Sequence, residues 1–215
     1  NLQILKKIIK KNSKIKIIKS KVNSETDFKN IISKAKNKMS KIHGVVYALY
    51  PKNKSWGEAF QNIKEKDLKE NLFYQVGFPI LFSKIISNYF IKNKIDGKVV
   101  LISSIQGINS PKFEHYKNTT MISPIEYSAA KAAIIMITRY LASYFKGKSI
   151  NFNCVSPGGI FDNQPRKFVE RYKKDCLSKG LLDAKDILGS IIFLLSDSSK
   201  FINGQNIIID DGWSL

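Results

Sequence analysis

Short apolar runs alternate with helix-compatible stretches along this chain, and this alternation restricts the fold more than any other feature of the sequence. The run over residues 44–50 is continuously apolar and is closed by Pro51, and further short strands are predicted over 98–104, whose centre is apolar, and over 150–155. Continuous apolar runs of this length are typical of strands that are buried on both faces. Strands that alternate with helices therefore predict an α/β fold with a largely parallel sheet.

The remaining elements follow from apolar spacing and capping residues. Gly77 and Pro79 are predicted to kink the longest helix without ending it. The chain has 215 residues, 43% of them apolar, and no repeat or linker divides it, so we expect one domain over 1–215. Further strands are expected over 15–18 and 205–209, and helices over 2–11, 24–40, 66–92, 125–145, 164–174 and 183–195.

The net charge of +19 raises the question of a polyanionic partner. Only three of the 36 basic residues are arginines, the side chain that phosphate and base recognition favours. The lysines are spread along a chain that is also rich in Ile and Asn, which favours solvated surface charge over a nucleic-acid site. Residues 6–21 hold the densest lysine cluster and would be the candidate for the alternative.

The cysteines and the hydropathy give three expected absences. Cys154 and Cys176 have no CxxC partner, and we interpret them as reduced thiols in a cytoplasmic protein. No run approaches the roughly 18 uncharged apolar residues of a membrane span. We therefore expect no disulfide, no metal site and no membrane segment.

Tyr127 and Lys131 are the first candidates for chemistry. They are four residues apart on a predicted helix that follows Pro124, so they lie one turn apart on the same face. A lysine ammonium near a phenol favours the phenolate and lowers a pKa that is otherwise about 10. Tyr127 would then exchange a proton near neutral pH. The alternative is an ordinary amphipathic helix edge, because pairs at this spacing are common.

Several polar or turn-forming stretches follow predicted strands. These are 47–51, Ser103-Ser104 and the turn Ser156-Pro157-Gly158-Gly159-Ile160. Ligands bind at the carboxyl ends of the strands of an open parallel sheet, so we expect these stretches to meet Tyr127 there. Each stretch alone has a plain alternative, since strands commonly end in Ser, Gly and Pro turns.

These motifs occur in a fixed order: Asn71 on the long helix, Ser103-Ser104, the Tyr127/Lys131 pair, 155–159 and the tail 203–212. In this arrangement the chain resembles the short-chain dehydrogenase/reductase family, from about residue 15 to residue 215. The resemblance implies a Rossmann-like parallel sheet with helices on both faces and NAD or NADP as cofactor. The stretches 104–107, 111–114, 156–165 and 210–215 are similar to the flagellin-modification oxidoreductases of the family, which act in sugar metabolism for surface glycans.

The resemblance also assigns roles to individual residues. Tyr127 would donate or accept the substrate proton, and Lys131 would hold its pKa down and contact the nicotinamide ribose. Ser104 would orient the substrate oxygen, and Asn71 would hold a water molecule in the proton relay. Pro157, Gly158 and Ile160 would line the cofactor side. A homo-oligomer formed through the Asn71 and Tyr127 helices is implied as well.

One departure from the family concerns the loop before Tyr127. Ser104 and Tyr127 are separated by more residues than is usual in the family, and the additional length holds 113–116. We hypothesise that this insertion shapes a polar pocket of the size of a sugar. The resemblance implies hydride transfer, which would then take place at a hydroxyl or carbonyl of a sugar-like substrate. The alternative is an ordinary surface loop.

A second departure concerns the cofactor site. The glycine-rich turn that meets a pyrophosphate is missing, because the first glycine of the chain is Gly44. By resemblance, about 40 residues carrying the first βαβ portion would be absent, which would expose the strand at 44–50 as an apolar edge. The chain would then be either an oxidoreductase whose catalytic part is present or an inactive scaffold that acts through oligomerisation.

Overall fold

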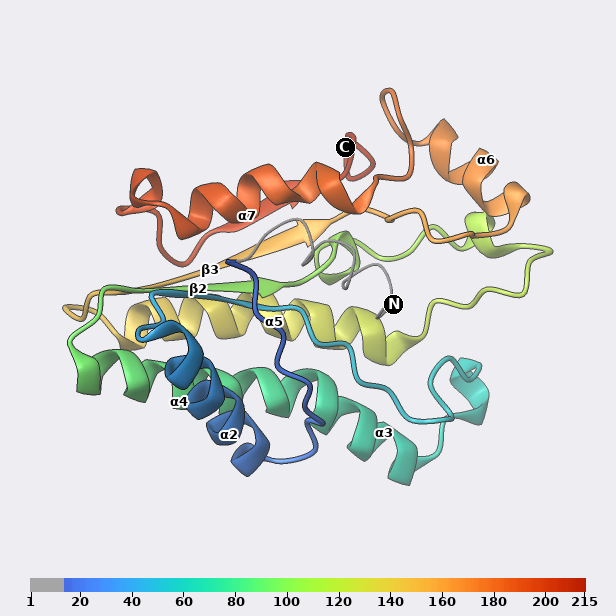
Figure 1. The fold of residues 1–215 in the computed structure, drawn as a ribbon. Helices are drawn as coiled ribbons and strands as arrows, with labels where there is room; N and C mark the ends of the chain where they lie inside the picture. The colour runs from blue at the N-terminus through green and yellow to red at the C-terminus, as the bar shows by residue number, and fades with distance from the viewer. Residues whose placement is uncertain (1–13) are drawn as a thin grey trace. The chain divides into compact units, whose positions relative to one another are not determined.

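The structure is a computed structural model that describes residues 14–215 (Figure 1). Two compact units make up the chain, Asn1–Ile42 and His43–Leu215. The helix expected over 2–11 and part of the lysine cluster lie outside the described residues. Helix α2 (Glu25–Met39) begins where predicted, because the hydroxyl of Ser24 accepts a hydrogen bond from the backbone N–H of Asp27 at 3.3 Å.

The strand expected over 15–18 is wrong. Residues 15–22 have no helical or strand structure, and Ile15 and Ile17 are each 39% exposed. An apolar run that is rich in β-branched residues forms a strand only when a neighbouring strand supplies the backbone hydrogen bonds. In the described part of the chain no strand pairs with these residues.

The second unit is built on a parallel sheet. Its four described strands are β1 (Gly44–Tyr47), β2 (Gly97–Ile102), β3 (Ile150–Pro157) and β4 (Asn206–Ile209), in the order β1-β2-β3-β4 and all parallel. Helices α4 (Phe78–Asn93) and α5 (Ile125–Tyr144) cover one face of the sheet, and α7 (Leu188–Leu195) covers the other (Figure 1). The prediction of an α/β fold with a Rossmann-like parallel sheet is therefore confirmed.

Burial follows position in the sheet. Central strands β2 and β3 supply fully buried residues such as Leu101 and Phe152, because both of their faces are covered. Strand β1 is an outer strand of the sheet in the described residues, and Val46 on it is 38% exposed. This matches the apolar edge that the sequence predicted for 44–50.

The longest predicted helix is a continuous helical stretch in three parts. Helix α3 (Glu65–Leu72) leads into a π-helical turn (Phe73–Gly77) and then into α4. The backbone N–H of Phe78 donates to the carbonyl oxygen of Phe73, five residues earlier, which is the bond that defines a π turn. A change of helix type over Phe73–Gly77 thus lies where the kink was predicted, and the helical stretch continues through it as expected.

The loop over 105–124 contains two 3-10 turns, Ile105–Gly107 and Phe113–Tyr116. The second of these turns contacts α6 (Arg166–Lys174). A hydrophobic cluster fixes the loop, α6 and the C-terminal tail together, and its buried members are Ile105, Phe168, Tyr172, Leu181 and Trp213. Helix α7 follows a 3-10 turn (Ala184–Ile187) that Asp183 and Asp186 cap reciprocally.

Candidate active site

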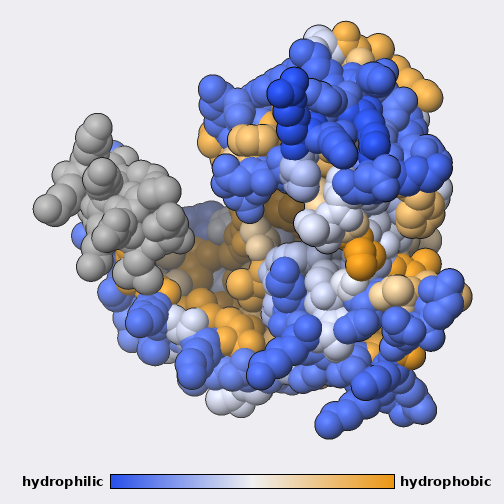
Figure 2. All heavy atoms as spheres, turned by 90° about the vertical axis from the view of Figure 1, so that its right-hand side faces the viewer, coloured by the Kyte–Doolittle hydropathy of each residue, from blue (hydrophilic) through white to orange (hydrophobic). Residues whose placement is uncertain are grey.

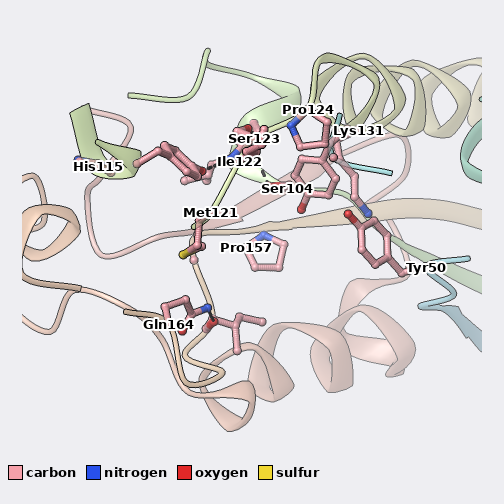
Figure 3. Close-up of a pocket in the computed structure, with 18 of the residues that line it drawn as sticks. Tyr50, Ser104, His115, Met121, Ile122, Ser123, Pro124, Lys131, Pro157 and Gln164 are labelled. Carbon is pink, nitrogen blue, oxygen red and sulfur yellow. Dashed lines mark hydrogen bonds between the residues drawn. The ribbon is translucent and has the colours of Figure 1, made fainter. Parts of the chain in front are cut away.

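A cavity of about 730 Å³ opens at the carboxyl ends of the strands. The residues that line it come from the ends of β1, β2 and β3, the start of α5, the 105–124 loop, α6 and the C-terminal tail (Figure 3). All but one of the predicted site residues line this cavity: Ser104, Tyr127, Lys131, Pro157, Gly158 and Ile160. The exception is Asn71.

The end of β2 is tied directly to α5. The hydroxyl of Ser103 donates to the carbonyl oxygen of Lys131 at 2.7 Å, and Ser104 caps the next turn by accepting the N–H of Gln106 at 3.2 Å. Gly107 completes this turn against the α5 backbone. A Cβ atom at Gly107 would lie 2.6 Å from the carbonyl carbon of Lys131. These contacts hold the Ser104 hydroxyl beside the cavity.

Lys131 projects from α5 toward the end of β2. Its Nζ donates to the carbonyl oxygen of Ile102 at 3.0 Å and lies 5.5 Å from the centre of the Tyr127 ring. Lys131 is only 8% exposed, and this burial lowers its pKa to about 8. Near neutral pH the cavity therefore contains a mostly protonated ammonium that is easily deprotonated.

The pKa of Tyr127 moves in the direction opposite to the one predicted. Burial raises it from 10.0, and a hydrogen bond with Ser104 only partly opposes that rise. Desolvation disfavours the phenolate more strongly than the polar neighbours of Tyr127 favour it. Tyr127 is consequently a protonated phenol at neutral pH, which is the form that donates a proton.

Asn71 is buried at the end of α3, outside the main cavity. Its side-chain oxygen accepts the backbone N–H of Asn53 at 3.2 Å, and the residue is 1% exposed. It lines a second cavity of about 270 Å³, together with Glu126. The structure therefore brings three of the four predicted catalytic residues together and places the fourth in this adjoining space.

Aromatic rings cover the Tyr127/Lys131 pair on the side of β1. Tyr50 meets the Tyr127 ring edge-on at 5.7 Å, and Trp56 meets the Tyr50 ring at 5.5 Å. The Nζ of Lys131 lies 5.7 Å from the centre of the Tyr50 ring, and Figure 3 shows the two side chains next to each other. The position of Tyr50 after a strand marked it in the sequence, whereas no sequence signal indicated Trp56.

The opposite wall is the turn that follows β3. The N–H of Gly158 donates to the carbonyl oxygen of Ile209 at 2.8 Å, and the N–H of Gly159 donates to the hydroxyl of Tyr172 at 2.6 Å. A Cβ atom at Gly158 would lie 2.9 Å from the Cα of Asp210. The turn is thus held between β4 and α6, with no room for a side chain at Gly158.

The 105–124 loop forms a third wall. Met121, Ile122 and Ser123 border the cavity in Figure 3. Farther along this wall, His115 is buried and its Nε2 lies 2.5 Å from a carboxylate oxygen of Asp175. The hydrogen bond with His115 holds the pKa of Asp175 below 3.8. The loop is therefore anchored and lines the cavity, as the insertion hypothesis requires, while the size and class of the ligand remain a prediction.

Helix α6, which borders the cavity, is rich in basic residues. Figure 2 views the side toward which the strands of Figure 1 point, and strongly hydrophilic residues (dark blue) gather at its top, over α6. These residues include Arg166, Lys167, Arg171, Lys173 and Lys174.

Among residues 14–215, no group of three or more His, Cys, Asp or Glu side chains is placed to hold a metal ion. No helix in the same residues is both long and apolar enough to cross a membrane.

A family model and curated proteins both match this chain. The family model described as enoyl-(acyl carrier protein) reductase matches residues 2–214. The post-translational flagellin modification protein A of Campylobacter coli is 40% identical, over all of this chain and 85% of that protein. The 2-dehydro-3-deoxy-D-gluconate 5-dehydrogenase of Dickeya dadantii is 28% identical over 69% of this chain and 57% of that enzyme.

Solved structures show the same fold. A short-chain dehydrogenase from Leptospira borgpetersenii with bound NAD+ superposes with a TM-score of 0.82 and 25% identity, over 92% of this chain and 75% of that chain. A 4-hydroxyisoleucine dehydrogenase complexed with NADH and succinate gives a TM-score of 0.81 at 21% identity, over 100% of this chain and 86% of that chain. At 21% identity the second likeness concerns the fold alone.

Proposed function

Because this chain belongs to the short-chain dehydrogenase/reductase family of oxidoreductases, we propose that it is an NAD(P)-dependent enzyme. It transfers a hydride at a hydroxyl or carbonyl of a sugar-like substrate. The observation that carries the proposal is the convergence of Ser104, Tyr127 and Lys131 on one cavity. A phenol, a hydroxyl and an ammonium around one space form a set that binds a carbonyl or alcohol oxygen and moves its proton.

The roles of these residues follow from their environments. Tyr127 is the proton donor in the direction of reduction, since burial keeps it a protonated phenol. Ser104 hydrogen-bonds the same substrate oxygen from the end of β2. The Lys131 ammonium, 5.5 Å from the Tyr127 ring, stabilises the negative charge that the phenol oxygen gains as its proton leaves. Oxidation of an alcohol uses the same groups in reverse.

The residues of the cavity fit the nicotinamide and ribose part of a dinucleotide. Lys131 offers a buried ammonium to ribose hydroxyls, and the Pro157-Gly158 turn and Ile160 offer a flat wall without a projecting side chain at Gly158. When bound, the cofactor supplies or removes the hydride. Residues 1–43 contain no glycine from which to build the usual pyrophosphate-binding turn.

Asn71 is proposed to act from the second cavity. Its side-chain oxygen accepts the N–H of Asn53, which holds the side chain at the end of α3. We assign to it the retention of a water molecule between the Lys131 region and solvent. The π-helical turn that follows Asn71 is a feature that often accompanies functional sites.

The relatives and the cavity lining support a sugar-like substrate. One relative is named for flagellin modification, and another for a dehydrogenase of a deoxy-gluconate. The lining offers Gln106, Ser123 and Gln164 as neutral hydrogen-bonding side chains, which suit several hydroxyl groups. On this basis we place the activity in the modification of flagellin or other surface glycans, in the cytoplasm and without a nucleic-acid or membrane partner.

An exposed apolar stripe on α5 supports a homo-oligomer. Met136, Tyr140 and Tyr144 on this helix are 60%, 64% and 69% exposed. The same stripe is what an inactive scaffold would use to assemble. Cofactor binding distinguishes the two hypotheses. An enzyme must bind NAD(P) beside the Lys131 ammonium, whereas a scaffold that only assembles has no need to bind it.

Calorimetric titration of the protein with NADH and NADPH tests the proposal. We expect one of the two coenzymes to bind, and Lys131→Met to weaken that binding. Glu65→Gln, on the exposed side of α3, is the control and should bind like the wild type. Absence of binding by either coenzyme would favour the scaffold.

A further inference from the structure

Glu126 is a buried acidic side chain that the proposed chemistry does not use. It lies on the first turn of α5, directly before Tyr127, and is 3% exposed. Its Oε2 atom has neither solvent contact nor a hydrogen-bond partner among the described residues. Buried polar atoms in native proteins are nearly always paired with protein or with water, so this carboxyl oxygen calls for a partner other than residues 14–215, such as water.

The second cavity offers that partner a place. Its 270 Å³ is enough for several water molecules, each of which takes about 30 Å³ in the liquid. Asn71, Ser55 and Asn62 line it with Glu126 and supply polar groups for such water. The cavity is both polar and roomy, and these are the conditions under which buried water is retained.

The two cavities are lined by neighbouring residues of the same two segments. From the loop after β1, Trp56 and Gly57 line the main cavity, while Ser55 and Glu58 line the second. At the start of α5, Tyr127 lines the main cavity and Glu126 the second. Neighbouring residues of both segments thus face alternate spaces.

The charges that face Glu126 are known from the lining of this cavity. The loop contributes Glu58, and α3 with its preceding residue contributes Asp67 and Lys64. Glu58 is exposed at the rim.

We propose that Glu126 exchanges the proton of the Tyr127 site with solvent through water in the second cavity. The inference rests on the proposed oxidoreductase function. Glu126 does not touch the reacting atoms and is a positioning residue for the proton path.

The proton balance in the direction of reduction is simple. The Tyr127 O–H bond breaks as its proton passes to the substrate oxygen, and the cofactor supplies the hydride. An N–H of Lys131 restores the phenol, and water near Asn71 returns a proton to Lys131. Glu126 then gives its carboxyl proton to that water and takes one from solvent. One solvent proton enters per turnover, and oxidation reverses each step.

Substitution with chemical rescue tests the proposal. Glu126→Ala should lower kcat about tenfold or more, while KM changes little, because only the proton path is interrupted. Added formate fits the space that alanine leaves and should restore kcat in proportion to its concentration. Glu126→Gln should lose activity equally but show no rescue, because the amide fills that space. Glu65→Gln, an exposed carboxyl on α3, should behave as the wild type.

The outcomes separate this proposal from the proposed function. Glu126→Ala turning over at the wild-type rate, or losing activity without any response to formate, would overturn the proton path and leave the oxidoreductase intact. A wild type that transfers no hydride with either coenzyme would contradict the proposed function instead. An infrared measurement tests the proton path without substrate. The carboxyl band of Glu126 is identified by its absence from the spectrum of Glu126→Gln. When the wild type is mixed with D2O, this band should shift to its deuterated position within the mixing time. A band that stays unshifted for hours would overturn the proposal.

Discussion

The close packing of Gly107 against α5 leads to a sharp prediction for Gly107→Ala. A Cβ atom at this position would lie 2.6 Å from the carbonyl carbon of Lys131, 2.7 Å from its oxygen and 2.8 Å from the nitrogen of Ala132. All three are helix backbone atoms, so a side-chain rotation cannot relieve the clash. The turn that begins at Ser104 must move instead. Overpacking of this kind costs roughly 1–3 kcal/mol of the free energy of unfolding.

For a chain of this length, the expected loss corresponds to a fall of about 2–12 °C in the unfolding temperature. Activity should fall as well, because Ser104 is carried by the same turn. Gly189→Ala on α7 is the matched control. No atom lies within 4 Å of a Cβ there, so replacing a helical glycine should leave stability equal or raise it by up to about 1 kcal/mol. The assay is thermal unfolding followed by circular dichroism, and equal unfolding temperatures for Gly107→Ala and the wild type would refute the reasoning.

Three further predictions follow from single contacts. The pKa of Lys131 is about 8 in the folded protein, against an ordinary 10.5. Below pH 8 the buried side chain is charged, and this lowers the free energy of unfolding by about 3 kcal/mol. Stability should therefore rise between pH 8 and 10.5 in the wild type but not in Lys131→Met, as urea unfolding at both pH values would show. Tyr172→Phe should cost about 1–3 kcal/mol in the same assay, because the Gly159 N–H loses its 2.6 Å acceptor; no loss would contradict that bond. Hydrogen bonds from Ser178 and Gly180 lower the pKa of Asp211 from 3.8 to about 2, so its contribution should disappear as pH falls through that range. Acid unfolding of Asp211→Asn should lack this component, and identical acid transitions would argue against it.

The strands of the sheet could be predicted from the sequence because short, mostly apolar runs are typical of buried strands. The runs at 44–50, 98–104 and 150–155 all contain strands, and the central pair is buried on both faces. The run at 15–18 is also rich in isoleucine but forms no strand in the structure. Composition indicates that a segment can pair, whereas pairing itself depends on a neighbour. The π turn before Phe78 was not predictable for a similar reason, since it depends on which carbonyl accepts a single N–H.

The sequence predicted which residues form the candidate site but not how their surroundings shift their pKa values. Residue type, spacing and strand ends were enough to indicate that Ser104, Tyr127 and Lys131 would meet. The direction of the Tyr127 pKa was predicted wrongly, because the cost of burial depends on surroundings that sequence spacing does not describe. Trp56 and Glu126 were missed because their importance comes from which cavity each faces.

Turnover by wild type and Tyr127→Phe tests the central claim most directly. The phenylalanine variant keeps the ring that packs against Tyr50 and removes only the hydroxyl. With NAD+ and NADP+ and a panel of free and phosphorylated sugars, followed by nicotinamide absorbance, we predict turnover by the wild type. Tyr127→Phe should be slower by about a hundredfold or more, with coenzyme affinity unchanged. Equal rates for the two proteins would contradict the assignment of Tyr127 as the proton donor.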